Sequence, residues 1–163
     1  MVRWSILIFL LVPHWASFAQ NNDLIIYHTA IDMIKQSDDF IEYTEGKSGK
    51  VQVMETMIPF KNLSIFFKDS ISDITGLDHF ILANNPFIDD ERLSQLSDTN
   101  RSKLKLFLST LENDLFIVEI AYASRKRDYS YEGIFMFGPS LSYLFKTNGE
   151  KVDLVASMKM WNN

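Results

Sequence analysis

Hydrophobic side chains first recur at helical spacing in the segment Asp23–Tyr43. Residues three or four apart are apolar along one side of this segment, and polar residues fill the other side. Asp23 suits the first position, because its carboxylate can accept hydrogen bonds from the free N–H groups that begin a helix. The pattern predicts one helix over this segment, with a buried side formed by Leu24, Tyr27, Ile31 and Ile34.

Two glycines interrupt the pattern at residues 44–50, and shorter segments follow. A strand is predicted over Val51–Ile58, and Pro59 ends it because proline has no N–H group for a ladder. The next residues favour a strand at Leu63–Phe67 and a helical turn at Ser70–Thr75. One helix capped by Gly76 is the alternative for this part of the chain.

A further helical pattern follows a loop that begins at residue 84. Asp89 is placed to cap its first helix, and the polar run at residues 97–100 can divide the region into two helices. The apolar side of the second helix would consist of Leu104, Phe107, Leu108 and Leu111.

From Leu115 onward the hydrophobic period changes to two. Within residues 115–123, the odd-numbered and the even-numbered positions are both mainly apolar. This is typical of a central strand that is covered on both faces. Another strand is expected at residues 131–137. Asn148 and Gly149 both tolerate the positive φ angles of a tight turn, so they predict a hairpin between the last two strands.

The register of this hairpin follows if Asn148 and Gly149 are its two loop residues. Apolar side chains would then face one another on one side, and polar side chains would predominate on the other. The predicted opposite pairs are Phe145 with Val152, Tyr143 with Leu154, and Leu141 with Ala156.

These elements predict an α+β domain in which helices pack on one face of a curved, mostly antiparallel sheet of five to six strands. Their order is similar to that of the cone-shaped domains of the nuclear-transport-factor-like superfamily and, more loosely, of cystatin-like folds. This similarity concerns the fold alone, since no residue motif carries it. It implies that a pocket, if one is present, lies between the first helix and the concave sheet.

The N-terminus carries the pattern of a secretory signal. A basic residue precedes the nine-residue apolar run Trp4–Val12, which is shorter than the roughly 20 apolar residues that a bilayer span needs. Small residues stand three and one positions before Gln20, as at a signal-peptidase site. We expect a signal peptide of residues 1–19 and a single exported domain of residues 20–163, periplasmic or extracellular after cleavage. An ordered N-terminal strand is the alternative.

Composition narrows the classes of function. The chain contains no cysteine, which excludes disulfides, thiol catalysis and thiolate metal sites. Export without cysteine favours a bacterial periplasm or cell exterior. The formal net charge is −5, and it becomes −6 when Arg3 is removed with the signal peptide, so nucleic acid is an unfavourable partner.

His28 and Asp32 are the pair best spaced for acid–base chemistry. They stand one helical turn apart, so the carboxylate could orient the imidazole or begin a metal site. The structural alternative is that His28 packs beside the apolar side of its helix. The mature chain has one other histidine, His79, so a zinc site with three histidines is excluded.

The basic run at residues 125–127 is interleaved with tyrosines, and Tyr122 precedes it. Arginine and tyrosine are enriched at interface hot spots, because they combine a large contact area with directed donors. The alternative is a solvated hairpin tip. The predicted binding patch consists of Arg125, Lys126, Arg127, Tyr129 and Tyr131.

Three other patterns carry less chemistry. Gly46–Ser48 lacks the earlier glycine of a phosphate-binding loop, and Asp89–Glu91 lacks the alternating ligands of a calcium loop. Met158 and Met160 are predicted on the core-facing side with Leu154, where thioethers could bind cuprous copper or fill gaps in the core. We therefore expect no cofactor and no metal.

The sequence as a whole predicts a small exported binding module for an unknown protein or a small apolar ligand. No catalytic constellation can be assembled from it with any specificity. One alternative is a pocket-type enzyme or ligand carrier that uses His28 and Asp32. Another is a periplasmic inhibitor or immunity-type protein, whose acidic balance would suit a basic partner.

Overall fold

A computed structural model describes residues 12–45, 49–75, 84–123, 131 and 138–162. The helices are α1 (Val12–Lys35), α2 (Asp38–Tyr43), α3 (Phe60–Leu63) and α4 (Lys68–Thr75), with the 3₁₀ helices η1 (Ser64–Phe67) and η2 (Glu91–Leu96). The strands are β1 (Gln52–Val53), β2 (Thr56–Met57), β3 (Ile88–Asp89), β4 (Leu104–Leu108), β5 (Leu115–Tyr122), β6 (Gly138–Asn148) and β7 (Lys151–Asn162).

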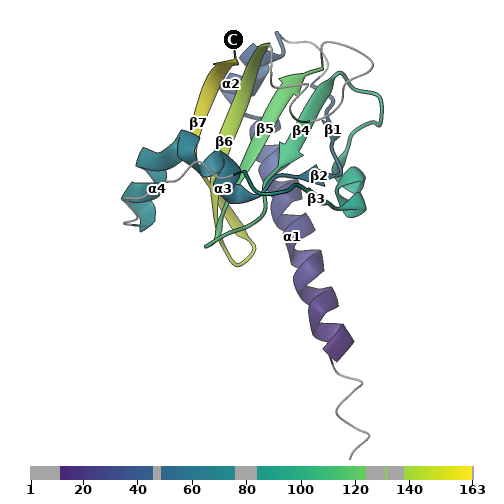
Figure 1. The fold of residues 1–163 in the computed structure, drawn as a ribbon. Coiled ribbons are helices and arrows are strands. Elements are labelled where there is room, and N and C mark those ends of the chain that lie inside the picture. Colours follow the sequence, from purple (N-terminus) through teal and green to yellow (C-terminus); the bar gives the residue numbers. More distant parts are fainter. Residues whose placement is uncertain (1–11, 46–48, 76–83, 124–130, 132–137, 163) are drawn as a thin grey trace, which may run out of the picture.

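Five strands form the main sheet, in the order β1-β4-β5-β6-β7, while β2 and β3 form a separate pair (Figure 1). β1 runs parallel to β4, and the neighbours from β4 to β7 are all antiparallel. The predicted α+β class is confirmed, and the sheet is mixed with antiparallel pairs in the majority.

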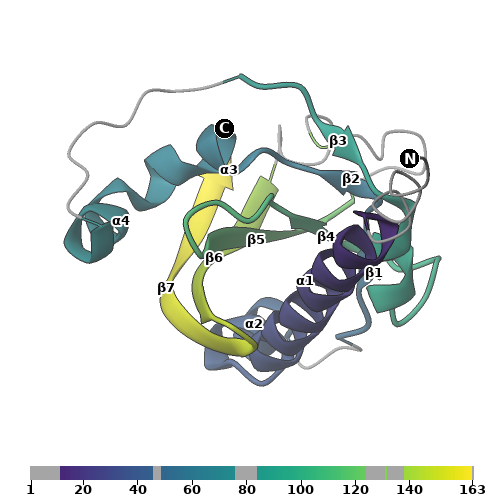
Figure 2. The ribbon, with the colours of Figure 1, turned by 90° about the horizontal axis from the view of Figure 1, so that it is seen from below.

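Helices lie on both sides of the main sheet (Figure 2). On the first face, α1 and α2 cover a core cluster that includes Tyr27, Ile31, Phe40, Leu106, Phe116, Val118, Tyr143 and Phe145. On the second face, α3, η1 and α4 cover a cluster that includes Phe60, Leu63, Phe67, Ile71, Phe107, Ile117 and Leu144.

The expectation that helices pack on one face of the sheet is therefore wrong. Every residue of β4 is buried, and β5 is buried from Leu115 to Ala121. Because successive side chains of a strand point to opposite faces, both faces need an apolar cover. The predicted central strand that begins at Leu115 and is covered on both sides is confirmed.

The predicted strand at Leu63–Phe67 is wrong. The chain is helical in α3, η1 and α4 from Phe60 to Thr75, so the predicted turn at Ser70–Thr75 lies within the last helix. The cause is the spacing of the buried residues, since Phe60, Leu63, Phe67 and Ile71 are three or four apart and all enter one cluster.

The predicted helix with Leu104, Phe107, Leu108 and Leu111 on its apolar side is also wrong. β4 occupies residues 104–108, and its alternate residues enter the clusters on opposite faces. The helix that precedes it is the short η2. Its N-cap is Asp90, which accepts a hydrogen bond from the N–H of Arg92, so Asp89 is not the cap.

The predicted strand Val51–Ile58 is divided between two sheets. β1 pairs with β4, whereas β2 pairs with β3. Val53 is buried in the cluster of the first face and Ile58 in that of the second. Side chains of this segment therefore enter the clusters on both sides of the domain, and the segment is divided because its partner strand changes from β4 to β3.

The predicted first helix is two helices. α1 begins at Val12, so Asp23 lies inside it, and Ser37 starts α2 by accepting a hydrogen bond from the N–H of Phe40. Contacts of the described α1 side chains with the core begin at Leu24. The first turns of α1 extend beyond the sheet in Figure 1.

The predicted hairpin is confirmed, but its loop lies one residue further along the chain. Asn148 pairs with Lys151, so the two loop residues are Gly149 and Glu150. Gly149 carries the positive φ angle, +65°. Asn148 is therefore the last paired residue of β6.

The register of the hairpin differs from the predicted one. Phe145 lies opposite Leu154 rather than Val152, and Leu144 lies opposite Ala156, so Val155 is an extra residue in β7. Because a bulge of this kind adds one residue to the strand, every side chain beyond it points to the opposite face from the one predicted. The predicted pairs of Tyr143 with Leu154 and of Leu141 with Ala156 are accordingly wrong, since their partners are Ser157 and Lys159.

We expect Gly149→Val to lower the free energy of unfolding by at least about 1 kcal/mol, because a β-branched residue is strained at positive φ. An added Cβ would meet nothing within 4 Å, so the loss would report backbone strain alone. Urea denaturation measures it, with Gly149→Asn as the control that tolerates this backbone. Equal midpoints for the valine variant and the wild type would contradict the turn.

Candidate functional site

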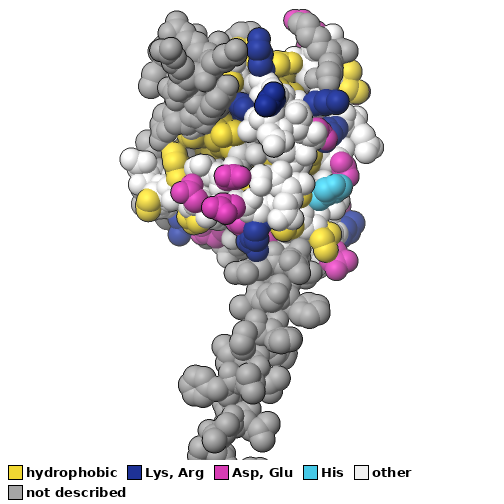
Figure 3. All heavy atoms as spheres, turned by 90° about the vertical axis from the view of Figure 1, so that its right-hand side faces the viewer, with side chains coloured by type: hydrophobic (Ala, Val, Ile, Leu, Met, Phe, Trp, Pro, Cys, Tyr) yellow, Lys and Arg dark blue, Asp and Glu magenta, His cyan; other side chains and the backbone are white. Residues whose placement is uncertain are grey.

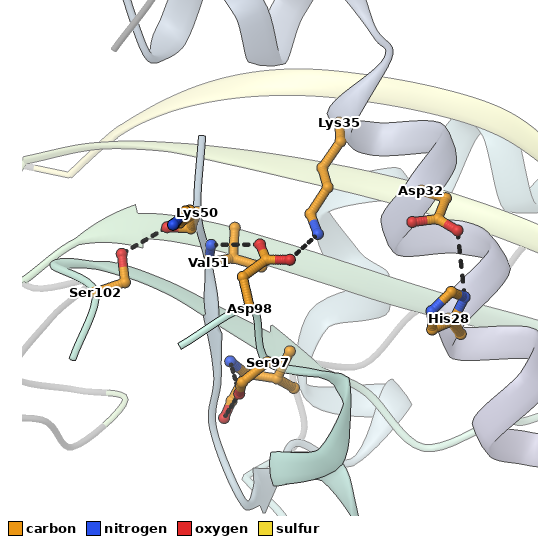
Figure 4. Close-up of polar contacts among 9 residues, drawn as sticks. His28, Asp32, Lys35, Lys50, Val51, Ser97, Asp98 and Ser102 are labelled. Atoms are coloured by element: carbon orange, nitrogen blue, oxygen red, sulfur yellow. Dashed lines mark hydrogen bonds and ion pairs between the residues drawn. The ribbon is translucent and has the colours of Figure 1, made fainter. Parts of the chain in front are cut away.

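His28 and Asp32 contact each other on the solvent side of α1 (Figure 4). His28 Nδ1 lies 3.2 Å from Asp32 Oδ2, and their side chains are 64% and 51% exposed. The predicted pair therefore forms. Neither residue lines either of the two grooves described below.

A separate network joins α1 to the start of β1 (Figure 4). Lys35 Nζ donates to Asp98 Oδ1 at 2.7 Å, and the N–H of Val51 donates to Asp98 Oδ2 at 2.9 Å. Burial raises the pKa of Asp98, but the hydrogen bonds from Lys35 and Val51 outweigh it and hold the pKa below its usual value. This network fixes structure and carries no visible chemistry.

The predicted basic patch is only partly described. Arg125, Lys126, Arg127 and Tyr129 lie outside the described residues. Tyr131 is described and is half-buried, with its ring edge-on against Phe87 and Phe107 at centroid distances of 5.6 and 5.4 Å. The described ring contacts of Tyr131 are packing contacts, and the binding patch that was predicted to include it stays a prediction.

The hydroxyl of Tyr131 reaches a fully buried carboxyl at the centre of the sheet. It donates to Glu119 Oε2 at 2.5 Å, and the hydroxyl of Ser142 donates to Glu119 Oε1 at 2.9 Å. Burial raises the pKa of Glu119 to about 7, although the two hydrogen bonds act in the opposite direction. The carboxyl therefore changes its charge near neutral pH.

Other polar side chains share the second face with Glu119. Lys105 donates to Gln52 Oε1 at 2.5 Å, and burial lowers the pKa of Lys105. Ser140 Oγ is the one buried side-chain polar atom without a hydrogen-bond partner in the part of the chain that the structure describes. General acid–base catalysis needs a group within reach of substrate. Glu119 has no exposed surface, so we assign it a structural role.

A groove of about 620 Å³ opens where α2 ends above the main sheet. We call it the tyrosine groove. It is lined by Glu42, Tyr43, Thr44, Glu45, Lys103, Tyr122, Pro139, Ser140 and Lys159.

Two stacked rings form the aromatic part of this groove. The rings of Tyr43 and Tyr122 have centroids 5.4 Å apart with planes inclined by 29°, and the Tyr43 hydroxyl donates to the carbonyl of Pro139 at 2.7 Å. Tyr122 is the last residue of β5 and the first exposed one, at 38%. Its ring emerges because the cover over the sheet ends there.

Charged residues stand at the border of the tyrosine groove. Lys159 Nζ lies 2.8 Å from Glu42 Oε2. Lys103 has no ion-pair or hydrogen-bond partner for its ammonium among the described residues. The groove therefore combines an exposed aromatic ring with an exposed cation.

A second groove, of about 650 Å³, lies along β1, β2, β3 and η2. Its lining is polar and includes Glu55, Asp89 and Glu91, and acidic side chains gather on that side of the molecule (Figure 3). Asp90, which stands between Asp89 and Glu91 in the sequence, does not line this groove and forms an ion pair with Arg92. No group of three or more potential metal ligands occurs within the described residues.

The bulge in β7 also changes the positions of the methionines. Met158 lies opposite Ser142 on the second face, whereas Leu154 lies opposite Phe145 on the first. The prediction that Met158 and Met160 share the face of Leu154 is therefore wrong. Met158 and Met54 pack against the second cluster and Met57 against the first, which is the behaviour of side chains that fill gaps in a core.

No protein-family model, curated protein or solved structure matches this chain. None of the helices in the described residues combines the length and the apolar character that a membrane crossing requires.

We expect the pKa of Glu119 to make stability depend on pH. The folded pKa of about 7 lies above the ordinary 4.5. The stability that protonation contributes is thus complete below pH 4.5 and is lost as pH rises through 7. Relative to Glu119→Gln, the wild type should lose about 3 kcal/mol of unfolding free energy between pH 4.5 and 8.

Denaturation at a series of pH values measures this difference. Glu150→Gln, at an exposed position in the hairpin loop, is the matched control and should show no such change relative to the wild type. If the difference between wild type and Glu119→Gln stays constant with pH, the buried carboxyl does not titrate near neutrality and the assignment is wrong.

Proposed function

We propose that this protein is an exported binding module and that the tyrosine groove is its binding site. The observation behind the proposal is that the exposed Tyr122 ring and the exposed Lys103 line one groove of about 620 Å³. Recognition sites combine apolar and aromatic walls with a few polar groups that fix orientation. The groove has this composition without an adjacent acid–base pair.

The chemistry of the groove favours a ligand with a flat apolar ring face and a neighbouring anionic group. The ring would stack on Tyr122, since aromatic faces bind flat apolar surfaces. Its carboxylate or sulfate would pair with Lys103, as ammonium groups pair with anions. Such a group could belong to a free small molecule or to a side chain of a protein partner.

The enzyme alternative finds less support. His28 and Asp32 contact each other but stand exposed on α1, away from both grooves. The inhibitor or immunity-type alternative has one observation in its favour, which is the acidic lining of the second groove. Carboxylates gathered on one side would attract a basic partner.

The cone-like or cystatin-like architecture with a curved sheet also stays a proposal. It is supported by the order of the elements and by α1 lying along one face of the antiparallel strands. The pocket that this architecture would place under the first helix is occupied among the described residues by the core cluster of the first face. The tyrosine groove lies instead at the end of that face.

Export is part of the same proposal. We expect the protein isolated from its natural compartment to begin at Gln20, because small residues precede the Ala19–Gln20 bond. The described contacts of α1 with the core begin at Leu24, so cleavage at this bond would leave them intact. Intact-mass measurement decides this, and a chain that retains residues 1–19 would contradict export by a cleaved signal.

The binding site is tested by NMR titration with small probes. We expect glucuronate and benzoate, which combine a ring with a carboxylate, to shift resonances of Tyr122 and Lys103, and glucose and benzyl alcohol to shift them less. Tyr122→Ala and Lys103→Glu should each weaken binding about tenfold. Phe66→Ala, which removes another exposed aromatic ring outside the groove, is the control.

If the probes bind Tyr122→Ala and Lys103→Glu as tightly as they bind the wild type, the tyrosine groove is not the binding site. Shifts that cluster instead at Glu55, Asp89 and Glu91 on addition of a basic peptide would favour the inhibitor alternative. Turnover of a substrate that is lost in His28→Ala would favour the enzyme.

A further inference from the structure

We propose that a second copy of this chain pairs its β7 with β7 of the first in antiparallel orientation, so that the two main sheets join. The proposal concerns the outer edge of β7 from Ala156 to Met160. It is independent of the ligand suggested for the tyrosine groove.

No described strand pairs with the outer edge of β7. β7 is the last strand of the sheet and spans twelve residues. Within the described residues, its backbone hydrogen bonds go to β6 alone. In Figure 1, α4 lies to the left of β7 and α2 lies beside its upper part, toward the C-terminus, while none of the described strands pairs with its outer edge. Unpaired N–H and C=O groups in a row recognise another extended chain.

The side chains beyond the bulge define two faces of this edge. Ser157 and Lys159 belong to the first face, because they lie opposite Tyr143 and Leu141. Ala156, Met158 and Met160 belong to the second face, opposite Leu144, Ser142 and Ser140. The first face of the edge is polar and the second is apolar.

α2 places carboxylates beside the polar side of the edge. Ser157 Oγ donates to Asp39 Oδ2 at 2.7 Å, and Lys159 Nζ lies 2.8 Å from Glu42 Oε2. Asp39 has no ion-pair partner in the part of the chain that the structure describes. The edge therefore offers Lys159, which is paired with Glu42, and the Asp39 carboxylate, which is held by Ser157 two residues before Lys159 and has no cation among the described residues.

These positions complement each other across a two-fold axis at Met158. Antiparallel pairing about this residue puts Ser157 opposite Lys159 of the second copy, with Cβ atoms about 5 Å apart. Because Asp39 is bonded to Ser157, that lysine comes within reach of the Asp39 carboxylate. The symmetry repeats the contact, so the dimer contains two Asp39–Lys159 pairs.

The apolar side of the edge fits the same register. Met158 meets Met158 of the second copy, and Ala156 meets Met160. All three side chains are half-buried in the single chain, and Ala156 and Met158 already pack against the second cluster. No like charges stand directly opposite in this register. These features favour a second copy over an unrelated peptide, because both complementary surfaces belong to this chain.

Analytical ultracentrifugation of the purified protein, expressed from the full chain, tests the proposal. We expect the wild type to be dimeric at about 0.1 mM and to dissociate on dilution. Asp39→Lys and Lys159→Glu should each give a folded monomer, because each places two like-charged pairs in the interface. Asp38→Lys, with the same charge change at the neighbouring exposed position of α2, should remain dimeric.

Mixing the two monomeric variants is the decisive step. In the mixed dimer, the lysine introduced by Asp39→Lys faces the glutamate introduced by Lys159→Glu, and the unchanged Asp39 and Lys159 face each other at the second contact. The mixture should therefore dimerise although neither variant does so alone. Circular dichroism shows whether Asp39→Lys and Lys159→Glu fold. If either variant is unfolded, Ser157→Lys is used in its place, because it would put a lysine opposite Lys159 of the second copy and should prevent dimerisation.

Three results would overturn the proposal. They are a wild type that stays monomeric at about 1 mM, charge variants that still dimerise, and a mixture of monomeric variants that does not associate. If the wild type does not self-associate but binds an added extended peptide at β7, the partner of this edge is a different protein and not a second copy of this chain.

Discussion

The need to bury both faces of β5 determines the arrangement of this domain. Seven consecutive residues of the strand are buried, and alternate ones enter clusters on opposite sides of the sheet. Since apolar surface contributes about 25 cal/mol per Å² when it is removed from water, neither face can be left exposed without a large loss. α1 and α2 supply the cover on one side, and α3, η1 and α4 supply it on the other.

Two polar features of β5 are explained by the helices that cover it. One lies where the strand is covered on both faces, and the other lies where the cover ends. Glu119 lies in the fully covered part, so its carboxyl is isolated from water and depends on the hydroxyls of Tyr131 and Ser142. Tyr122 lies where the cover ends, and its ring emerges beside Tyr43 at the end of α2. β7, which no further described strand pairs with, is the lateral limit of the same sheet. The buried Glu119 carboxyl, the tyrosine groove and the outer edge of β7 thus all follow from the way in which helices cover the main sheet.

Local patterns could predict the elements whose chemistry is local. Gly149 requires a turn, and the doubly apolar segment from Leu115 requires a central strand; both inferences are confirmed. Leu104, Phe107 and Leu108 fit a helix by spacing as well as a strand. Such short apolar runs are ambiguous until their neighbours are known. The segment from Phe60 to Ile71 was ambiguous for the same reason.

The site depended on contacts between distant segments. His28 and Asp32 were predicted to contact each other, but their exposure depends on how α1 packs. The tyrosine groove joins residues of α2, β5, β6 and β7 that have no common sequence motif. Glu119 did leave a signal, as the single charged residue within the apolar strand β5. An unpaired carboxyl is costly there, so partners such as Tyr131 could have been expected.

Native-state hydrogen exchange is the most direct measurement of the central claim, that β5 is the doubly covered centre of the domain. Partial openings expose the less stable units first, and the best-protected amides exchange only through global unfolding. We expect the amides of Phe116–Ile120 to open with the free energy of global unfolding found by denaturation. Exchange of these amides through openings of much lower free energy, while those of α4 stay protected, would show that β5 is not the doubly covered centre.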